Sequence, residues 1–408
     1  MATQLSSAPP GGRLHGLDAL RAAALLGGIV LHSLMPFLPG GLWLVNDAAP
    51  QPWALPVVYL IHLARMVIFM LLAGYFGRMV VQRRGSRSYL RDRAKRILLP
   101  AVVFWPIAVL PLGLLAGLNA TVNPELPAAV APPSDAPPIL LLFSPGQLWF
   151  LLVLMECAVI VVALRAIALR VIPASRRVPE LAGAWLSIPV VGPLLAGIPY
   201  LAALLVQGDL QMGIIAPPTI VPSVPALLCY GGAFVVGWSL HAHPDSMSRL
   251  GGGWVLHLAL AVPLSVAGYL LSPAMIGAPA YAALTALAAW TWTFGLVGLC
   301  VRRLTGERAW VRYLADASYW LYLVHLPLLV AVEIPMAGAA WSPIVKILIA
   351  WVVTAVVGLA GYDLLVRGTW VGGWLNGRRR RPLWRGTVDP PRPAAEPAPV
   401  RAGLAEDS

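Results

Sequence analysis

Long apolar runs alternate with short polar segments along almost the whole chain. Ten of these runs span roughly 18 to 25 residues and carry few charges, which is the length that a helix needs to cross the hydrocarbon core of a bilayer. The pattern therefore predicts an all-α polytopic membrane protein with ten transmembrane helices. Their expected ranges are 18–38, 56–79, 98–118, 147–170, 184–206, 222–241, 253–272, 278–301, 315–336 and 343–366.

Glycine and proline interrupt two of these regions. The run at 184–206 is the weakest of the ten because it contains several of both, although membrane helices tolerate them better than soluble helices do. The triplet Gly251-Gly252-Gly253 is predicted to be a turn, because it has neither a flanking strand nor the lysine of a phosphate-binding loop.

The positions of the basic residues predict how the chain crosses the membrane. If the ten helices alternate in direction, the inter-helix segments on one side and the C-terminal segment hold 24 of the 29 Lys and Arg residues, and the opposite loops hold none. Basic loops stay in the cytoplasm. We therefore expect both termini to be cytoplasmic and the protein to lie in the cell (inner) membrane. The basic segments are 80–97, 165–177, 242–252, 302–314 and 367–408.

Both ends of the chain differ in composition from the apolar region 18–366, which is the expected membrane domain. Residues 1–17 are polar and are expected to form a cytoplasmic segment. The run that follows contains Asp18, Arg21 and His32, which favours an uncleaved first helix over a signal peptide. The tail at 367–408 is basic and then rich in Pro and Ala, so we expect a disordered cytoplasmic tail.

Composition narrows the class of protein further. Hydrophobic residues make up 59% of the chain and charged residues only 11%, whereas a soluble domain carries about 25% charge. These values exclude a disordered chain, a basic nucleic-acid-binding domain and an ordinary cytosolic enzyme. The three cysteines, Cys157, Cys229 and Cys300, lie within apolar runs, so we expect buried thiols rather than disulfides.

Ionisable residues within the predicted spans are the first candidates for function, because burying them in a bilayer is costly. Arg21 and His32 are eleven residues apart, about three helical turns, and therefore share one face of the first helix. Asp18 lies next to Arg21 on that face. On the second helix His62 and Arg65 also share a face, and Arg65 is expected near the depth of His32.

Two acids and one further histidine extend this group. Glu156 lies in the fourth predicted span, and His325 and Glu333 lie in the ninth. Either acid would be a suitable partner for Arg65, and the sequence does not choose between them. Arg65 is equally consistent with a structural ion pair and with a role in stabilising an oxyanion. The alternative for His32 is a neutral imidazole bonded to nearby backbone.

The segment after the second helix has the highest density of positive charge in the chain. Ordinary topology and anionic headgroups explain part of this density. The functional alternative is a surface that binds a phosphate-rich ligand, to which the arginine fork is well suited. The basic residues are Arg83, Arg84, Arg87, Arg91, Arg93, Lys95 and Arg96. We expect no metal site, because the pair His241 and His243 has no third ligand nearby.

Several short motifs together resemble the membrane acyltransferase family 3, and within it the branch of the glucans biosynthesis protein C succinyltransferases. The combination is more specific than any one motif. The motifs are Gly16-Leu17-Asp18-Ala19-Leu20-Arg21 with His32, the stretch from Leu60 to Phe76, Arg93-Ala94-Lys95-Arg96 before Pro100, Leu148-Trp149-Phe150-Leu151-Leu152, and Ser318-Tyr319-Trp320-Leu321-Tyr322-Leu323-Val324-His325. At one position the chain departs from that branch: Gln147 stands where a histidine is common.

This resemblance implies transfer of a succinyl or acetyl type of acyl group from cytoplasmic acyl-CoA to a hydroxyl of an extracytoplasmic glycan or glycolipid. His32 is then expected to be the general base, with Arg21, Arg65 and Glu333 in the catalytic group. The expected acyl-CoA contacts are Arg83, Arg84, Arg91, Arg93 and Arg96. The expected substrate contacts are Asp18, His62, Trp149, Glu156 and His325. Acyl-CoA is expected as a donor substrate, with no permanently bound cofactor.

A transporter or flippase for an acidic or lipid-linked solute is the alternative function. Such a protein also needs many spans and buried charges. The charges here are concentrated in the first, second and ninth predicted helices, and no inverted duplication of the sequence is visible. This distribution favours the transferase.

Overall fold

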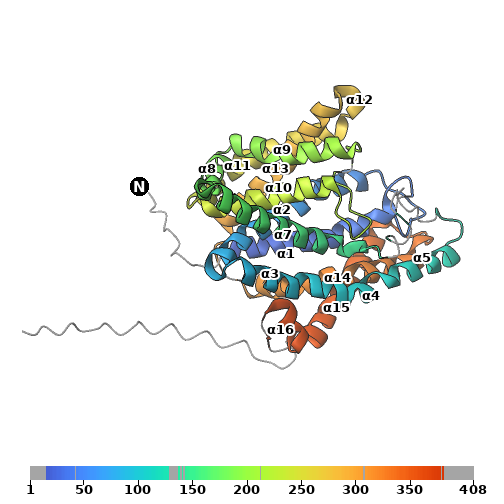
Figure 1. Cartoon of the computed structure of the whole chain (residues 1–408). Coiled ribbons are helices and arrows are strands. Elements are labelled where there is room, and N and C mark those ends of the chain that lie inside the picture. Colours follow the sequence, from blue (N-terminus) through green and yellow to red (C-terminus); the bar gives the residue numbers. More distant parts are fainter. Residues whose placement is uncertain are drawn as a thin grey trace, which may run out of the picture.

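The computed structural model describes residues 15–41, 43–127, 137, 140, 143–211, 213–306, 308–377 and 379–380. In this part of the chain the regular structure is entirely helical, which confirms the predicted all-α class. Figure 1 shows most of the long helices lying side by side in one bundle.

The break between α8 and α9 divides the helical elements into two groups. The first group is α1 (His15–Leu34), η1 (Met35–Phe37), α2 (Ala54–Arg84), α3 (Ser86–Arg93), η2 (Ala94–Leu98), α4 (Leu99–Ala108), α5 (Leu110–Val122), η3 (Gly146–Leu148), α7 (Trp149–Val171), η4 (Pro173–Arg177) and α8 (Val178–Leu186). The second group is α9 (Val191–Gln207), α10 (Val224–Ala242), α11 (Ser246–Leu270), α12 (Pro273–Ile276), α13 (Ala278–Arg303), α14 (Ala309–Ala337), α15 (Pro343–Gly361), η5 (Tyr362–Arg367) and α16 (Trp370–Asn376).

Nine helical segments of the described chain are long and apolar enough to cross a membrane, and each overlaps one predicted span. The predicted span at 184–206 is instead a bent pair. The chain bends by 113° between Pro173–Leu186 and Val191–Gln207. Pro189 lies in the break and has no N–H to continue a helix. Its carbonyl accepts a hydrogen bond from Nε2 of His257 at 2.7 Å, so the broken backbone is stabilised by α11.

The prediction of a turn at Gly251-Gly252-Gly253 was wrong, because these residues lie inside α11. Gly251 lies where α11 packs along α13, whereas a methyl group added to Gly252 would meet nothing within 4 Å and Gly253 lies against Pro189. A methyl group added to Gly298 of α13 would collide with the carbonyl oxygen of Leu250. Glycines at this crossing therefore allow the two backbones to approach closely, as small residues commonly do between membrane helices.

Helix α2 lies in the centre of the bundle and contacts α1, α10 and α13. The backbones of α2 and α10 approach each other closely at two glycines, one on each helix. Gly74 of α2 lies against the carbonyl oxygen of Phe234, and Gly237 of α10 lies against that of Leu71. This packing fixes the depth of α2, and with it the position of the polar residues that α2 carries.

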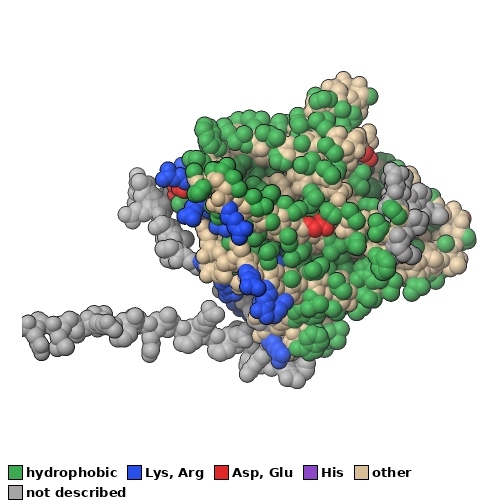
Figure 2. Space-filling view, in the orientation of Figure 1, with side chains coloured by type: hydrophobic (Ala, Val, Ile, Leu, Met, Phe, Trp, Pro, Cys, Tyr) green, Lys and Arg blue, Asp and Glu red, His purple; other side chains and the backbone are tan. Residues whose placement is uncertain are grey.

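The two ends of the bundle differ in charge. Figure 2 shows the Lys and Arg side chains gathered at the end where α3 and α8 lie, while apolar side chains cover most of the flank in view. We call this the basic end; it includes Arg83, Arg84 and Arg91 around the α2–α3 junction. The opposite end contains residues 43–52 and the connection between α14 and α15. That the basic end faces the cytoplasm stays a prediction.

The expected terminal segments are only partly covered. Residues 1–14, Arg378 and 381–408 lie outside the described residues. Part of the tail that was expected to be disordered is instead the short helix α16 (Trp370–Asn376). The indole Nε1 of Trp374 donates to the carbonyl of Lys95 at 2.7 Å, and Arg380 pairs with Asp316 at 2.7 Å. These contacts fix α16 to the basic end.

Candidate active site

His32 and His325 come together near the end of α1 that lies away from the basic end. Their ring centroids are 5.4 Å apart, and the rings are tilted by 39°. The other neighbour of the His32 ring is Trp43, which follows η1 and stacks on it at 5.3 Å. Residues from α1, α14 and the segment after η1 therefore enclose one imidazole pair.

The backbone of α14 fixes which nitrogen of His325 accepts a proton. Nδ1 lies 2.9 Å from the carbonyl oxygen of Tyr322 and 3.1 Å from that of Leu321. Carbonyl oxygens only accept, so Nδ1 carries the hydrogen. In the neutral ring Nε2 is then an acceptor, and it is buried without a partner among the described residues. Such an orphaned polar atom costs about 1–3 kcal/mol.

Arg65 of α2 lies beside the same pair. Its guanidinium rests against Gly28 of α1, one turn before His32, where an added methyl group would collide with Nη1. It is also within electrostatic range of His32 and His325. Because residue 28 is a glycine, the guanidinium of Arg65 has room to lie beside the imidazoles of His32 and His325.

His62 joins this group from α2, since it lies three residues before Arg65 and shares its face of the helix. The four residues that the structure brings together are His32, His62, Arg65 and His325, and we call them the histidine–arginine cluster. Tyr230 and Tyr322 also lie within electrostatic range of Arg65. The cluster thus combines three imidazoles with one guanidinium at the centre of the bundle.

Neither predicted acid is paired with Arg65 among the residues described here. Glu156 lies on α7, is partly exposed, and has one buried oxygen without a partner in the described chain. Glu333 lies eight residues beyond His325 on α14, about 12 Å along the helix axis. Glu333 is therefore separated from His325 along α14, and its expected place in the catalytic group stays a prediction.

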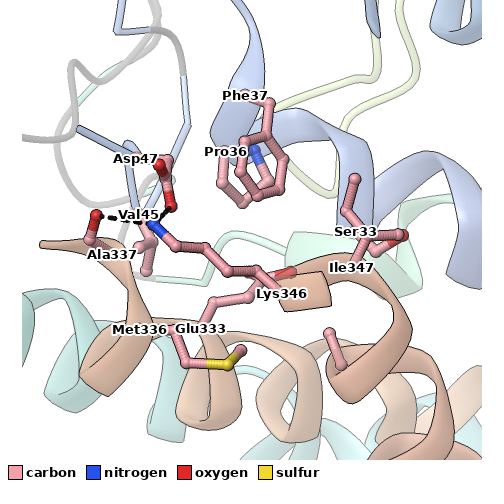
Figure 3. A pocket seen from close by; sticks show the side chains of 11 residues that line it. Ser33, Pro36, Phe37, Val45, Asp47, Glu333, Met336, Ala337, Lys346 and Ile347 are labelled. Atoms are coloured by element: carbon pink, nitrogen blue, oxygen red, sulfur yellow. Dashed lines mark hydrogen bonds and ion pairs between the residues drawn. The ribbon is translucent and has the colours of Figure 1, made fainter. Parts of the chain in front are cut away.

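Glu333 instead lines a small pocket at the opposite end, which Figure 3 shows from close by. It is 6% exposed, and neither carboxylate oxygen has a partner within the described ranges. The pocket also contains a buried ion pair: Nζ of Lys346 lies 2.7 Å from Asp47 and 3.3 Å from the carbonyl of Ala337. Its volume of about 10 Å³ admits one water-sized group.

The predicted Asp18–Arg21 pair forms on the first turns of α1, with 3.7 Å between the charged atoms. Next to it, at the basic end, lies a cavity of about 430 Å³ between α1, α13 and α14. Its walls include the small residues Ala19, Ala22 and Ala23 of α1. Basic residues also line it: His15, Arg303, Arg308 and Arg312. A volume of this size is typical of ligand pockets.

The arginines of the predicted donor surface differ in their surroundings. Arg83, Arg84 and Arg91 are exposed, as a long-range attraction for anions requires. Arg93 and Arg96 instead pair with Asp92, at 3.6 Å and 2.8 Å. Residues Ala94–Leu98 form a single π-helical turn, a feature that is frequent at functional sites.

Residues at the start of α7 link this helix to the cluster. Trp149 packs on Tyr230 at 5.7 Å between ring centroids. Gln147, which stands where the resembling branch has histidine, donates from Nε2 to the carbonyl of Leu323 at 3.0 Å, and its own carbonyl accepts from Tyr322. Gln147 therefore holds α14 one turn from His325.

Several residues near these sites were not expected from the sequence. Trp43 and Asp47 lie in what the pattern indicates is a short outer loop, and Lys346 lies at the edge of an apolar run. A charged residue at the start of a predicted span is a signal for a buried ion pair. Arg303 and Arg308 were counted only as topological charges, although their position before the ninth span offered a second basic surface.

Comparison with known proteins agrees with the geometry. The model of the acyltransferase 3 family, described as an acyltransferase domain, matches residues 14–363. Glucans biosynthesis protein C of Salmonella typhi is 26% identical over 336 residues, which cover 79% of this chain and 84% of the relative. The protein of the same name from Salmonella typhimurium has the same identity and coverage. No solved structure matches.

Proposed function

Because the chain belongs to the acyltransferase 3 family, we propose that it is a membrane O-acyltransferase that moves an acyl group of succinyl or acetyl type from acyl-CoA to a glycan or glycolipid hydroxyl. The donor approaches from the cytoplasm and the acceptor from the other side of the inner membrane. The observation that carries the proposal is the histidine–arginine cluster, in which unpaired imidazole nitrogens lie beside a guanidinium inside the bundle.

In the proposed reaction the acceptor oxygen attacks the carbonyl carbon of the thioester. His32 takes the hydroxyl proton as the oxygen–carbon bond forms. The carbon–sulfur bond then breaks, and the same proton passes to the sulfur, which leaves as the CoA thiol. His325, through its acceptor Nε2, takes a hydrogen bond from a second hydroxyl of the acceptor molecule and so positions the attacking one beside His32.

Arg65 is the proposed electrostatic partner of the transition state. Negative charge develops on the thioester oxygen during attack, and a fixed cation in a site without bulk water stabilises it. The close approach of Arg65 to Gly28 places the guanidinium one helical turn from His32. His62 shares the face of Arg65 and is proposed to contact the substrate.

The cavity at the basic end is the proposed entry of the donor. Acyl-CoA carries several phosphate charges, and Arg303, Arg308 and Arg312 line the cavity. The alanines of α1 on its wall leave room for a slender chain that runs along the helix past Asp18 and Arg21. The exposed arginines Arg83, Arg84 and Arg91 attract the donor to the same end, while Arg93 and Arg96 shape the α3–α4 segment that contacts α16.

A direct assay tests this proposal. The purified protein in lipid nanodiscs is incubated with radiolabelled acetyl-CoA or succinyl-CoA and glucose oligosaccharides. We expect labelled oligosaccharide ester and an equal amount of free CoA thiol. Uptake of a solute by proteoliposomes without any acyl chemistry would favour the transporter and overturn the proposal.

A further inference from the structure

The segment from Trp43 to Asp47 covers the histidine–arginine cluster on the side away from the basic end. Trp43 stacks on His32, Val45 is fully buried, and Asp47 is fixed to Lys346 of α15. Nδ2 of Asn46 bonds the carbonyls of Trp43 and Pro127, at 3.2 Å and 2.8 Å. A group that approaches His32 from the opposite end must pass this segment.

Unpaired polar atoms lie along this path. Within the part of the chain that is described, partners are lacking for Nε1 of Trp43, both carboxylate oxygens of Glu333, Nδ1 of His32 and Nε2 of His325. Nε1 of Trp43 can only donate, whereas Nε2 of His325 and the oxygens of Glu333 can accept. His325 and Glu333 lie about 12 Å apart along α14, so one ligand with several hydroxyl groups could supply partners for all of these atoms.

The charges around the path select the kind of ligand. Asp47 and Glu333 both line the pocket, so a phosphate or carboxylate is disfavoured there. The ammonium of Lys346 in the same pocket disfavours a cation (Figure 3). A neutral molecule with several hydroxyl groups suits both conditions, because each hydroxyl donates one hydrogen bond and accepts others.

We infer that the acceptor subsite lies under the Trp43–Asp47 segment, between the His32–His325 pair and Glu333, and that it binds sugar hydroxyls. The inference rests on the proposed function and gives its acceptor a position. Glu333 accepts a hydrogen bond from one hydroxyl, and Nε1 of Trp43 donates to another. The small volume of the Glu333 pocket admits one hydroxyl arm, so the rest of the sugar lies towards Trp43 and displaces this segment.

Two conservative variants test the subsite. Glu333→Gln keeps the shape of the side chain and replaces its carboxyl group by an amide, while Trp43→Phe keeps an aromatic ring and removes its N–H. The matched control is Trp53→Phe, because Trp53 lies at the same end, is exposed, and bonds only Gln51 in the described structure. Each protein is studied as the full chain in nanodiscs.

Two readouts are measured for each variant. The first is equilibrium binding of radiolabelled glucose disaccharides without donor, and the second is the KM for acceptor and for acyl-CoA. We expect Glu333→Gln to weaken disaccharide binding and to raise the acceptor KM, each by about 10-fold. We expect Trp43→Phe to change both quantities in the same direction by about 5-fold. These factors correspond to the loss of one hydrogen bond in each variant. The acyl-CoA KM and the Trp53→Phe control stay unchanged.

The outcomes separate this inference from the proposed function. If the wild type transfers acyl groups but both variants match the control in binding and acceptor KM, the subsite is wrong and the transferase stands. If the wild type binds disaccharide, the variants bind less, and no acyl group is transferred, the subsite stands and the transferase is wrong. A wild type that binds no disaccharide overturns the subsite.

Discussion

His32 and His325 differ in what holds their rings. The ring of His325 is oriented by two backbone carbonyls of its own helix, so its acceptor nitrogen points in a fixed direction. The ring of His32 is positioned by stacking on Trp43. A hydroxyl placed between the rings can donate its proton to only one of them, and the more adaptable His32 is the proposed base.

The first prediction concerns this division of roles. His32→Ala is expected to lower kcat by about 10² to 10⁴, the usual contribution of a positioned base. The KM for acyl-CoA stays near the wild-type value, because the donor cavity lies at the other end of α1. His325→Ala is expected to lower kcat less, since that ring only positions the acceptor molecule. Steady-state kinetics on nanodisc samples provide the measurement.

His243, at the end of α10, supplies the matched control, because its replacement by Ala removes an imidazole that lies outside the cluster. A folded His32→Ala protein with near-normal turnover would contradict the assignment. A larger loss from His325→Ala than from His32→Ala would exchange the two roles.

The second prediction concerns pH. An imidazole in water has a pKa near 6.5, and only its neutral form accepts a proton. Transfer by the wild type is therefore expected to fall as the pH drops and the imidazoles become protonated. The rate is measured at saturating donor from about pH 8 downwards, to the lowest pH at which the protein stays folded. A rate that rises as the pH falls would contradict an imidazole base, because a protonated ring cannot accept the hydroxyl proton.

At the scale of elements, α1 connects the two ends of the site. Its first turns carry Asp18 and Arg21 beside the donor cavity, and His32 lies eleven residues further on. The sequence predicted this stripe correctly, because helical periodicity alone fixes which residues share a face. It did not predict that Arg65 reaches α1 at Gly28, since that contact depends on the crossing of two helices.

The surroundings of Glu333 also could not be predicted from the sequence. Its spacing from His325 on one helix was available from the sequence, yet its surroundings depend on Asp47 and Lys346, which are almost three hundred residues apart. The break between α8 and α9 was predicted only as a weak span. Proline content indicated an irregular region, but the bend depends on tertiary contacts such as the one from His257 to Pro189.

The third prediction separates two basic surfaces. Arg303→Gln with Arg308→Gln is expected to raise the KM for acyl-CoA about 10-fold or more, since each charge-assisted bond to phosphate contributes about 1.5–3 kcal/mol. Arg93→Gln with Arg96→Gln is expected to have a smaller effect, because Asp92 already pairs with both arginines. High salt should reproduce part of the first effect. A larger rise in the KM for acyl-CoA with Arg93→Gln and Arg96→Gln than with Arg303→Gln and Arg308→Gln would instead indicate that the 83–96 segment binds the donor.

The fourth prediction concerns the ion pair that fixes the Trp43–Asp47 segment. Both side chains are nearly inaccessible, at 2% and 3% exposure. Lys346→Met leaves the Asp47 carboxylate buried and unpaired, which costs about 3–5 kcal/mol. We expect a clear drop in thermal stability for Lys346→Met and a smaller one for the double variant Asp47→Leu with Lys346→Met. Equal losses would mean that the pair contributes no mutual stabilisation.

At the scale of the whole molecule, the bundle keeps donor and acceptor on different ends. The arginines proposed to bind the phosphates of the donor gather at the basic end (Figure 2). The unpaired polar atoms of the proposed acceptor path lie beyond the histidine–arginine cluster. The cluster is the only part that both substrates must reach. The central claim is therefore that one protein carries an acyl group between two substrates that never share a compartment.

Proteoliposomes with the protein in one orientation test this claim most directly. Labelled acyl-CoA is supplied only on the side of the basic end, and the glucose oligosaccharide only inside the other compartment. The account predicts labelled oligosaccharide ester on the acceptor side, CoA thiol on the donor side, and loss of both with His32→Ala. Ester formed only when both substrates are on the same side, or ester formed equally well by His32→Ala, would contradict it.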